Sequence, residues 1–460
     1  MDIESLSKKL LLTKNFGQKE VFLLQSFLDY YFKNNRPRSF KKFEKPLRET
    51  IFNFINVMSF NDLLTVIPNF YLFCYTVHSD ISDQRQKLIS KFVFQPFAER
   101  IRELIQNKNI DPLNFSPKGN KYLIICRHAV TQGRYASGKQ IYTIVDALLE
   151  SKNDVTLIVH GNIDEMFSEL NYSNNNLELI NMSLGIDAFK DFLHLRKLCA
   201  KLRPYKIITE IEIGLATCLY YSGIKSKILY WSPGFYRFPW YDIKLLIPEI
   251  YEIDISNISD LIEIPHSLNY KLLAPPVKKE QIQTIRENNL GLKCNDFLIG
   301  TFSRYEKISE EFLRFVLEIL SNNPEIKFVL AGPNDQSFAK SILKDAIYRK
   351  QAILLGLSNV HLLGNSCDIF LDTFPTPCGY SALEMIAKGK PVLGIKGKHH
   401  NNFIKVRLPE LIYKTKEELE KTLLKLKSDK EFYNQIANKQ KQITSRLDKS
   451  KELASFLMKI

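Results

Sequence analysis

The distribution of apolar residues divides the chain into two kinds of segment. Predominantly apolar runs, such as Tyr122–Cys126 and Val155–Val159, are typical of strands buried on both faces of a parallel sheet. Segments with an apolar residue every three or four positions, such as Gln140–Glu150, are typical of helices packed on such a sheet. Because the two kinds alternate from about residue 120 to residue 410, we predict an α/β fold with two doubly wound, Rossmann-like domains.

Residues 1–115 show helical spacing only, for example over Glu20–Phe32 and Leu47–Met58, so we predict an all-helical N-terminal domain. Two segments rich in Pro, Gly or Asn, Asp111–Asn120 and Ala274–Val277, indicate domain boundaries. The predicted division is a helical domain over 1–115, a first Rossmann-like domain over 116–275 and a second over 276–460 with C-terminal helices.

Composition agrees with a globular, reduced protein. The 460 residues are 45% hydrophobic and 25% charged, which is ordinary for a chain with large cores. The seven Cys are odd in number and form no Cys-x-x-Cys pair, a pattern typical of reduced thiols. The N-terminus begins Met1-Asp-Ile-Glu4 and lacks the apolar region of a signal peptide. We therefore expect a cytoplasmic protein.

The formal net charge of +14 raises the question of an anionic partner, such as a nucleic acid or a membrane surface. Lys and Arg are spread along the chain, without a basic tail or a repeat of aromatic and basic residues, so nothing indicates a nucleic-acid partner. Contact with an anionic membrane surface, or a general preference for Lys, explains the charge equally well.

One stretch of the second domain predicts a ligand site. The apolar run Ile369–Leu371 indicates a buried strand, a loop with two Pro residues follows, and Ser381–Lys388 has the spacing of a short helix before the next strand at Pro391–Ile395. The helix opens at the loop, so the backbone N–H groups of Gly379, Tyr380 and Ser381 would bind phosphate. Glu384, one turn further, would reach sugar hydroxyls. The combination predicts a nucleotide pocket.

The same stretch resembles the donor-site signature of GT-B glycosyltransferases, in which a Gly-containing loop precedes E-A-(M/L)-A-x-G-x-P-V. The chain matches this signature at Glu384, Ala387, Gly389, Pro391 and Val392. The resemblance implies that the second Rossmann-like domain binds a nucleotide sugar, that the first faces the acceptor, and that Glu384 holds the ribose.

Retaining members of this superfamily usually carry a second Glu eight positions earlier, where the chain has Thr376. The departure favours the family of O-GlcNAc transferases and bacterial cytoplasmic adhesin N-glycosyltransferases, and it favours inversion. Phe302, Lys307 and Ile308 match the F-N-N-x-x-K-I motif of that family, in which the Lys contacts the donor diphosphate. Lys307 would stabilise the charge of the departing nucleoside diphosphate, and Arg304 could add a second cation.

The loop after the first strand offers candidates on the acceptor side. His128 is the residue type best matched to act as a base near neutral pH, and Arg134 lies in the same loop. Glu210 and Glu212 end a later strand and could bind acceptor hydroxyls.

Two further departures from the family concern its other motifs. Ser232–Phe235 stands where relatives have a G-H-P turn, without the His. We interpret Asp296–Phe302, Ile326–Gly332 and Val360–Gly364 as successive strands, which leaves too few residues before Asp368 for the helix that lines the nucleobase in relatives. That helix is therefore predicted to be trimmed.

The sequence thus predicts a glycosyltransferase that moves a hexose from a nucleotide sugar, UDP-linked by the resemblance, to a protein or glycan acceptor. No metal or other cofactor is expected, because no D-x-D motif occurs in a suitable setting: Asp368 and Asp372 lie on either side of a strand. Two alternatives remain open. One is a retaining GT-B enzyme of lipid-linked or surface polysaccharide synthesis, and the other is a non-catalytic GT-B-like binding module.

Overall fold

The computed structural model describes the chain at residues 49, 52–53, 55–56, 58–64, 95–131, 136–182, 187–210, 213–224, 226–231, 244–248, 261–264, 269–293, 295–304, 307–332, 335–375, 377–395, 412–445 and 449–460. The chain forms two compact units. The first comprises Met1–Ala129, Leu148–Ile247 and Ile255–Glu263, and the second comprises Val130–Ala147, Pro248–Asp254 and Ile264–Ile460.

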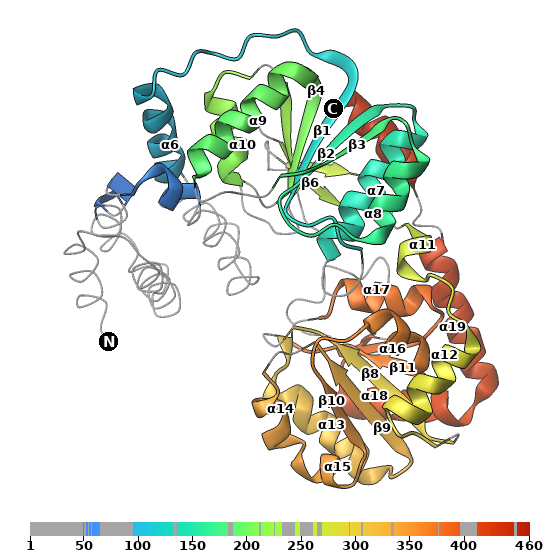
Figure 1. Ribbon diagram of the computed structural model, residues 1–460. Coiled ribbons are helices and arrows are strands. Elements are labelled where there is room, and N and C mark those ends of the chain that lie inside the picture. Colours follow the sequence, from blue (N-terminus) through green and yellow to red (C-terminus); the bar gives the residue numbers. More distant parts are fainter. Residues whose placement is uncertain are drawn as a thin grey trace. The chain divides into compact units, whose positions relative to one another are not determined.

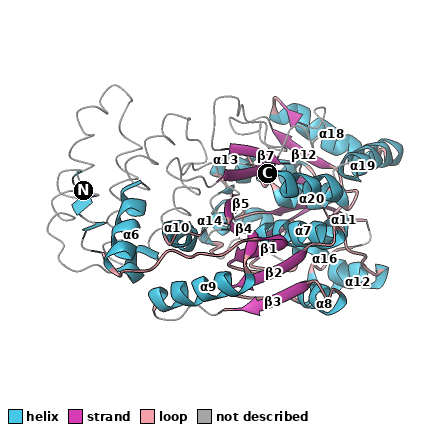
Figure 2. Cartoon of the chain, turned by 90° about the horizontal axis from the view of Figure 1, so that it is seen from above, coloured by secondary structure: helices cyan, strands magenta, loops and turns pink. Residues whose placement is uncertain are grey.

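The first sheet has seven strands in the order β3-β2-β1-β4-β5-β6-β7 (Figure 1). Its strands are β1 (Lys118–Cys126), β2 (Asp154–Val159), β3 (Leu177–Asn181), β4 (Pro204–Glu210), β5 (Lys227–Trp231), β6 (Lys244–Pro248) and β7 (Leu261–Ile264). Strands from β3 to β6 pair in parallel, with Ile125 of β1 opposite Ile158 of β2 and Thr209 of β4. Figure 2 shows β1, β2 and β3 side by side. The order reverses at β1, and ligands of such sheets bind at the carboxyl ends of the strands there.

The helices of this part of the chain alternate with the strands. They are α6 (Gln95–Asn107), α7 (Ala136–Glu150), α8 (Glu165–Ser173), α9 (Ala188–Leu202) and α10 (Ile213–Tyr221). Side-chain caps fix two of their starts: Asp164 accepts from the Phe167 N–H before α8, and Asp187 accepts from the first amides of α9. Residues of α7 up to Ala147 belong to the second compact unit.

The second sheet has six strands in the order β10-β9-β8-β11-β12-β13, all in parallel. They are β8 (Phe297–Phe302), β9 (Ile326–Ala331), β10 (Ala352–Leu355), β11 (Ile369–Leu371), β12 (Val392–Ile395) and β13 (Ile412–Tyr413). The accompanying helices are α11 (Tyr270–Leu273), α12 (Lys279–Thr284), the π-helix η3 (Ile285–Asn289), α13 (Glu310–Asn322), α14 (Ser337–Ile342), α15 (Lys344–Tyr348), α16 (Val360–Ser366), α17 (Tyr380–Ala387), α18 (Lys416–Ser428), α19 (Lys430–Ser445) and α20 (Ser450–Lys459).

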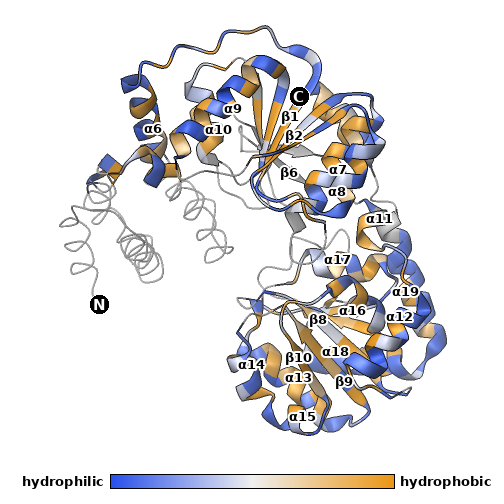
Figure 3. Ribbon diagram, viewed as in Figure 1, coloured by the Kyte–Doolittle hydropathy of each residue, from blue (hydrophilic) through white to orange (hydrophobic). Residues whose placement is uncertain are grey.

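Both faces of the second sheet are covered by apolar side chains. Neighbouring residues of one strand enter different clusters: Ile299 packs with Phe312 on one face, whereas Leu298 packs with Phe370 and Met385 on the other. In Figure 3 the strands are largely hydrophobic, while helices such as α12 and α18 carry much of the hydrophilic colour. Burial on both faces explains why these strands are continuous apolar runs.

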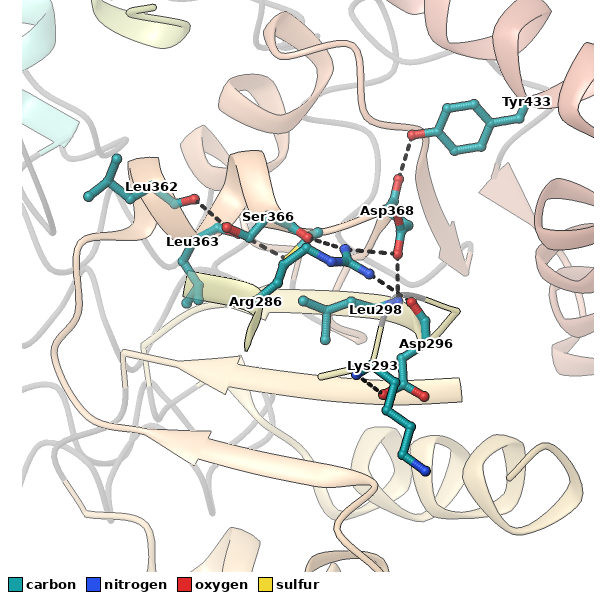
Figure 4. Close-up of polar contacts among 10 residues, drawn as sticks. Arg286, Lys293, Asp296, Leu298, Leu362, Leu363, Ser366, Asp368 and Tyr433 are labelled. Carbon is teal, nitrogen blue, oxygen red and sulfur yellow. Dashed lines mark hydrogen bonds and ion pairs between the residues drawn. The ribbon is translucent and has the colours of Figure 1, made fainter. Parts of the chain in front are cut away.

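An arginine joins the amino ends of the central strands (Figure 4). The Arg286 guanidinium, on the π-helix, donates to the carbonyls of Ser366 at 2.6 Å and Asp296 at 2.7 Å, and it pairs with the Asp368 carboxylate at 3.2 Å. The same carboxylate accepts from the Leu298 N–H at 2.7 Å. Asp368 is therefore part of a structural network at the amino end of β11.

The predicted α/β class with two parallel sheets is confirmed. The predicted N-terminal helical domain lies mostly outside the described residues, although α6 within it is a helix, and the three-way division of the chain stays a prediction. Among the described residues no helix is long and apolar enough to cross a bilayer.

One predicted strand is wrong. Residues 360–364 belong to α16, because the Asn359 side chain accepts from the N–H groups of His361 and Leu362 and so caps a helix. The third strand is instead β10, at Ala352–Leu355. The helix that we expected to be trimmed is therefore present between Gly356 and Asp368.

Candidate functional site

The loops that follow β8 and β11 are joined at the carboxyl edge of the second sheet. Ser309 caps α13 by accepting from the Phe312 N–H, and its hydroxyl donates to the Phe374 carbonyl at 2.7 Å. The Lys307 ammonium donates to the Pro377 carbonyl, also at 2.7 Å. Lys307 is half-buried, so its charged end has a fixed position beside the loop that leads into α17.

Gly379 begins the helix at this loop. Its φ of 68° and ψ of −116° lie in a region that a residue with a Cβ rarely adopts, which explains why Gly occupies the N-cap position. No side chain caps α17. The bonding of the helix begins with the Ala382 N–H, which donates to the Gly379 carbonyl at 3.0 Å. The preceding amides of Tyr380 and Ser381 have no acceptor within the helix, so the helix presents these N–H donors and the positive end of its dipole.

The loop before Gly379 is held from below by a buried acid. Asp372, at the carboxyl end of β11, is fully buried and accepts from the Cys378 N–H at 2.7 Å. Burial, followed by the neighbouring Asp372 charge, raises the pKa of the Cys378 thiol to about 11, so this cysteine is protonated and not a nucleophile. Asp372 acts here as a structural acceptor.

Glu384 lies on the buried side of α17. It is only 6% exposed, and its Oε1 accepts from the ammonium of Lys139, which is also 6% exposed. Lys139 belongs to the first turn of α7, within the second compact unit. The carboxylate predicted to hold a ribose is therefore part of a buried ion pair.

Two more titratable groups surround this ion pair. Burial lowers the pKa of Lys388 to about 8, against the raising effect of the Glu384 charge, and its ammonium donates to the Leu273 carbonyl at 2.6 Å. Burial, and next the Lys388 charge, lowers the pKa of His361 to about 4, so this imidazole is neutral at physiological pH. We call Lys139, Glu384, Lys388 and His361 the buried polar cluster. It combines two lysines with one carboxylate, and Lys388 is the residue that ends α17.

The first sheet holds His128 after β1. Its Nδ1 accepts from the Asn162 N–H at 3.2 Å, and a Cβ built on Gly161 would lie 2.4 Å from the same atom. Gly161 therefore allows the imidazole to pack directly on the backbone. Because Nδ1 accepts a hydrogen bond, the neutral ring carries its proton on Nε2.

Of the other acceptor-side candidates, the structure describes only Glu210. Glu210 is fully buried at the carboxyl end of β4. Arg134 and Glu212 lie outside the described residues. Burial also lowers the pKa of His160, at the end of β2, to about 4. Sequence analysis did not single out His160, although it ends a predicted strand one position beyond the apolar run.

The structure brings the predicted donor residues together in the second unit. Lys307 adjoins the loop of Gly379, while Tyr380, Ser381 and Glu384 follow on α17. Arg304 is exposed, and its carbonyl accepts from the Lys307 N–H at 3.1 Å. The residues that sequence analysis missed are Lys139, His361 and Lys388. Lys139 is 245 positions from its partner, so no local pattern could have indicated the pair.

Metal-ligating side chains are not clustered in the part of the chain that the structure describes. The described residues contain no group of three or more His, Cys, Asp and Glu side chains placed to hold a metal ion. Asp368 and Asp372 lie at opposite ends of β11, and Asp368 is occupied by Arg286. These two carboxylates cannot share one ion.

The sequence matches no family model and no curated protein. Solved structures are similar in fold. An O-GlcNAc transferase mutant from Thermobaculum terrenum aligns with a TM-score of 0.52 at 14% identity, over 99% of this chain and 96% of that one. A glycosyltransferase from Rickettsia africae gives 0.55 at 12% identity, over 74% of this chain and 98% of that one. HepE of Anabaena, in complex with UDP-glucose, gives 0.53 at 13% identity, again over 74% and 98%.

These neighbours confirm the resemblance to GT-B glycosyltransferases that the sequence motifs indicated. At this level of identity the similarity establishes the fold, with its two parallel-sheet domains.

Proposed function

We propose that the chain is a glycosyltransferase that transfers a hexose from a UDP-linked sugar to a protein or glycan acceptor. The proposal combines the shared fold with the site at the carboxyl edge of the second sheet. HepE, one of the structures of similar fold, binds UDP-glucose.

One observation carries the proposal: a lysine ammonium and an uncapped helix start converge on one loop. The Lys307 Nζ lies 2.7 Å from the carbonyl of Pro377, two residues before Gly379 opens α17. Helix N-termini and ammonium groups both favour phosphate. Their convergence in a doubly wound sheet fits a nucleoside diphosphate better than a neutral ligand.

In the proposed reaction the diphosphate of the donor binds to the amides of Gly379, Tyr380 and Ser381, with Lys307 beside it. The acceptor atom attacks the anomeric carbon, and the bond from that carbon to the diphosphate oxygen breaks. The negative charge that develops on the leaving UDP is met by Lys307 and by the start of α17, with no metal ion. Arg304 supplies a further cation near the diphosphate.

Inversion is proposed because Thr376 stands where retaining enzymes have a Glu. An inverting transfer needs a group that accepts the proton of the acceptor, and His128 is our candidate for that base. While Nδ1 accepts from the Asn162 N–H, Nε2 carries the proton of the neutral ring, so neither nitrogen is available as a base. The hydrogen bond from Asn162 must therefore break before His128 accepts the proton of the acceptor. Arg134, Glu210 and Glu212 are proposed to contact the acceptor.

The test uses the purified full-length chain. Calorimetry should give a dissociation constant for UDP of micromolar order, about 8 kcal/mol. GDP and CDP are the matched controls and should bind more weakly. Slow hydrolysis of one UDP-sugar from a panel would then identify the sugar, and transfer from the labelled sugar into a cell lysate would identify the acceptor.

Two results would count against the proposal. A chain that binds no UDP and hydrolyses no UDP-sugar does not use the proposed donor, whatever its fold. A product whose anomeric configuration matches the donor would leave the transferase assignment intact and replace inversion by retention.

A further inference from the structure

Lys139 occupies a position that folding alone does not favour. It lies in the first turn of α7, where the helix dipole disfavours a cation and where no acidic residue is present. Its side chain is nevertheless buried. Placing an ammonium there costs desolvation and side-chain entropy, which an apolar residue of similar size would avoid.

The ion pair with Glu384 offsets this cost but does not explain it. A buried ion pair contributes little net stability, because the attraction between the charges roughly cancels their desolvation. The buried polar cluster also contains Lys388, so Lys139 adds a second positive charge to a region that already has one. Stability alone therefore does not explain why a lysine occupies this position.

The face of α7 that carries Lys139 is held against the donor side of the second unit. Gln140 forms a side-chain hydrogen bond with Tyr380, the first residue of α17. Asp146, two turns along, accepts from Asn269 at 3.1 Å. A Cβ on Gly138 would lie 1.8 Å from the Val130 carbonyl oxygen, so the backbone in the first turn of α7 packs directly on Val130. Lys139 thus has a defined position.

The pairing leaves Glu384 able to bind a second partner. Lys139 engages Oε1, and a carboxylate has about four acceptor positions on its two oxygens. The paired ammonium holds the carboxylate in one orientation, and a carboxylate oxygen accepts hydrogen bonds from hydroxyls.

We propose that Lys139 is a positioning residue for ribose recognition, holding the Glu384 carboxylate oriented toward the ribose hydroxyls of the donor nucleotide. This inference rests on the proposed function. It makes α7 part of the donor site and assigns to the helix after β1 a role in reading the sugar of the nucleotide.

The experiment compares UDP with 2′,3′-dideoxyuridine diphosphate by calorimetry. The ratio of the two dissociation constants measures recognition of the ribose hydroxyls and is insensitive to a general loss of folded protein. We expect Lys139→Met to reduce this ratio by about tenfold, the loss of roughly one charge-assisted hydrogen bond. Lys139→Arg should retain most of the ratio, because it keeps the charge.

Two variants separate positioning from structure. Asn269→Ala removes another polar contact of α7 without touching Glu384, and it should leave the ratio unchanged. In the double variant Lys139→Met/Glu384→Gln the ratio should equal that of Glu384→Gln alone, since Lys139 acts only through Glu384. This double variant has no unpaired buried carboxylate, and a ratio below that of Glu384→Gln alone would show that Lys139 acts on the ribose by another route and would overturn the inference.

Each other outcome overturns the inference. An unchanged ratio in folded Lys139→Met means that the lysine is structural. Tighter UDP binding means that Lys139 competes with the ribose for Glu384. An equal loss for both nucleotides means that Lys139 contacts the diphosphate. Absence of UDP binding by the unmodified chain would instead refute the proposed function itself.

Discussion

Replacing Lys307 with methionine keeps most of the length of the side chain and removes its charge. The Lys307 ammonium is fixed at 2.7 Å from the Pro377 carbonyl, beside the start of α17. A diphosphate bound at this helix start would lie next to the ammonium, and it gains about one unit of negative charge as the glycosidic bond breaks. The substitution therefore tests stabilisation of the leaving group.

The size of the effect follows from Coulomb's law. Two unit charges about 4 Å apart, at an effective dielectric constant of about 20, interact by about 4 kcal/mol. Only the charge that develops during bond breaking raises turnover, since the charge already present in the bound donor contributes equally to both states. With about 1.4 kcal/mol per factor of ten, we expect kcat to fall by about 10²–10³-fold. The dissociation constant for the intact UDP-sugar, in which that charge has not yet developed, should rise by less than about tenfold.

Steady-state transfer kinetics with the preferred UDP-sugar, together with calorimetry for the same UDP-sugar in the absence of acceptor, give both quantities. Lys293→Met is the matched control, because Lys293 is an exposed lysine of the same unit beyond the amino end of β8. It should have normal kinetics. Normal turnover in Lys307→Met, or a loss confined to affinity for the UDP-sugar, would refute the assignment of Lys307 to the leaving group.

Four other predictions concern the site and the fold. Transfer should survive EDTA, and activity that stops on chelation and returns with Mn²⁺ would contradict this. Glu384→Gln should weaken UDP binding by about 1–3 kcal/mol in calorimetry, and unchanged binding would exclude a ribose contact. Arg286→Met should lower the free energy of unfolding in urea by about 2–3 kcal/mol, because the hydrogen bonds of Arg286 to the Ser366 and Asp296 carbonyls are lost. Arg314, which forms an exposed ion pair with Glu310, is the control, and Arg314→Met should change the free energy of unfolding by less than about 0.5 kcal/mol. Burial lowers the pKa of His361 to about 4, so the unfolded chain binds more protons than the folded chain between about pH 4 and 6.5, and the free energy of unfolding decreases as the pH falls through that window. His361→Gln should make this loss of stability smaller in acid titrations. The loss that remains should include the contribution of His160, whose pKa burial also lowers to about 4.

Strands buried on both faces could be predicted because both faces of the sheet require apolar side chains, which leaves a continuous apolar run in the sequence. Ile369–Leu371 is apolar throughout for this reason, Phe297–Phe302 is apolar apart from Gly300 and Thr301, and both appeared as predicted. Residues 360–364 have the same apolar character, but Asn359 in front of them caps a helix. A capping side chain outweighed the apolar run, and the predicted strand was wrong.

The donor site divides in a similar way between local and distant causes. Gly379 and the start of α17 could be predicted, because a turn that needs positive φ and a helix start leave a pattern in neighbouring residues. The burial of Glu384 against Lys139 could not, because the two are joined only through the folded chain. The same holds for Lys388 and His361, whose lowered pKa values result from burial that no local pattern reports.

The partners of Lys307 and Glu384 suggest different roles for the two ends of the proposed donor site. A carbonyl holds the Lys307 ammonium in place without neutralising its charge, so that charge stays available to a diphosphate. Glu384 is paired with an ammonium, so its charge is balanced before any ligand binds. A ribose needs directed acceptors rather than net charge, whereas a leaving diphosphate needs net positive charge. The arrangement therefore suits recognition at Glu384 and stabilisation of developing charge at Lys307, and it predicts that substitutions at the former change affinity while those at the latter change turnover.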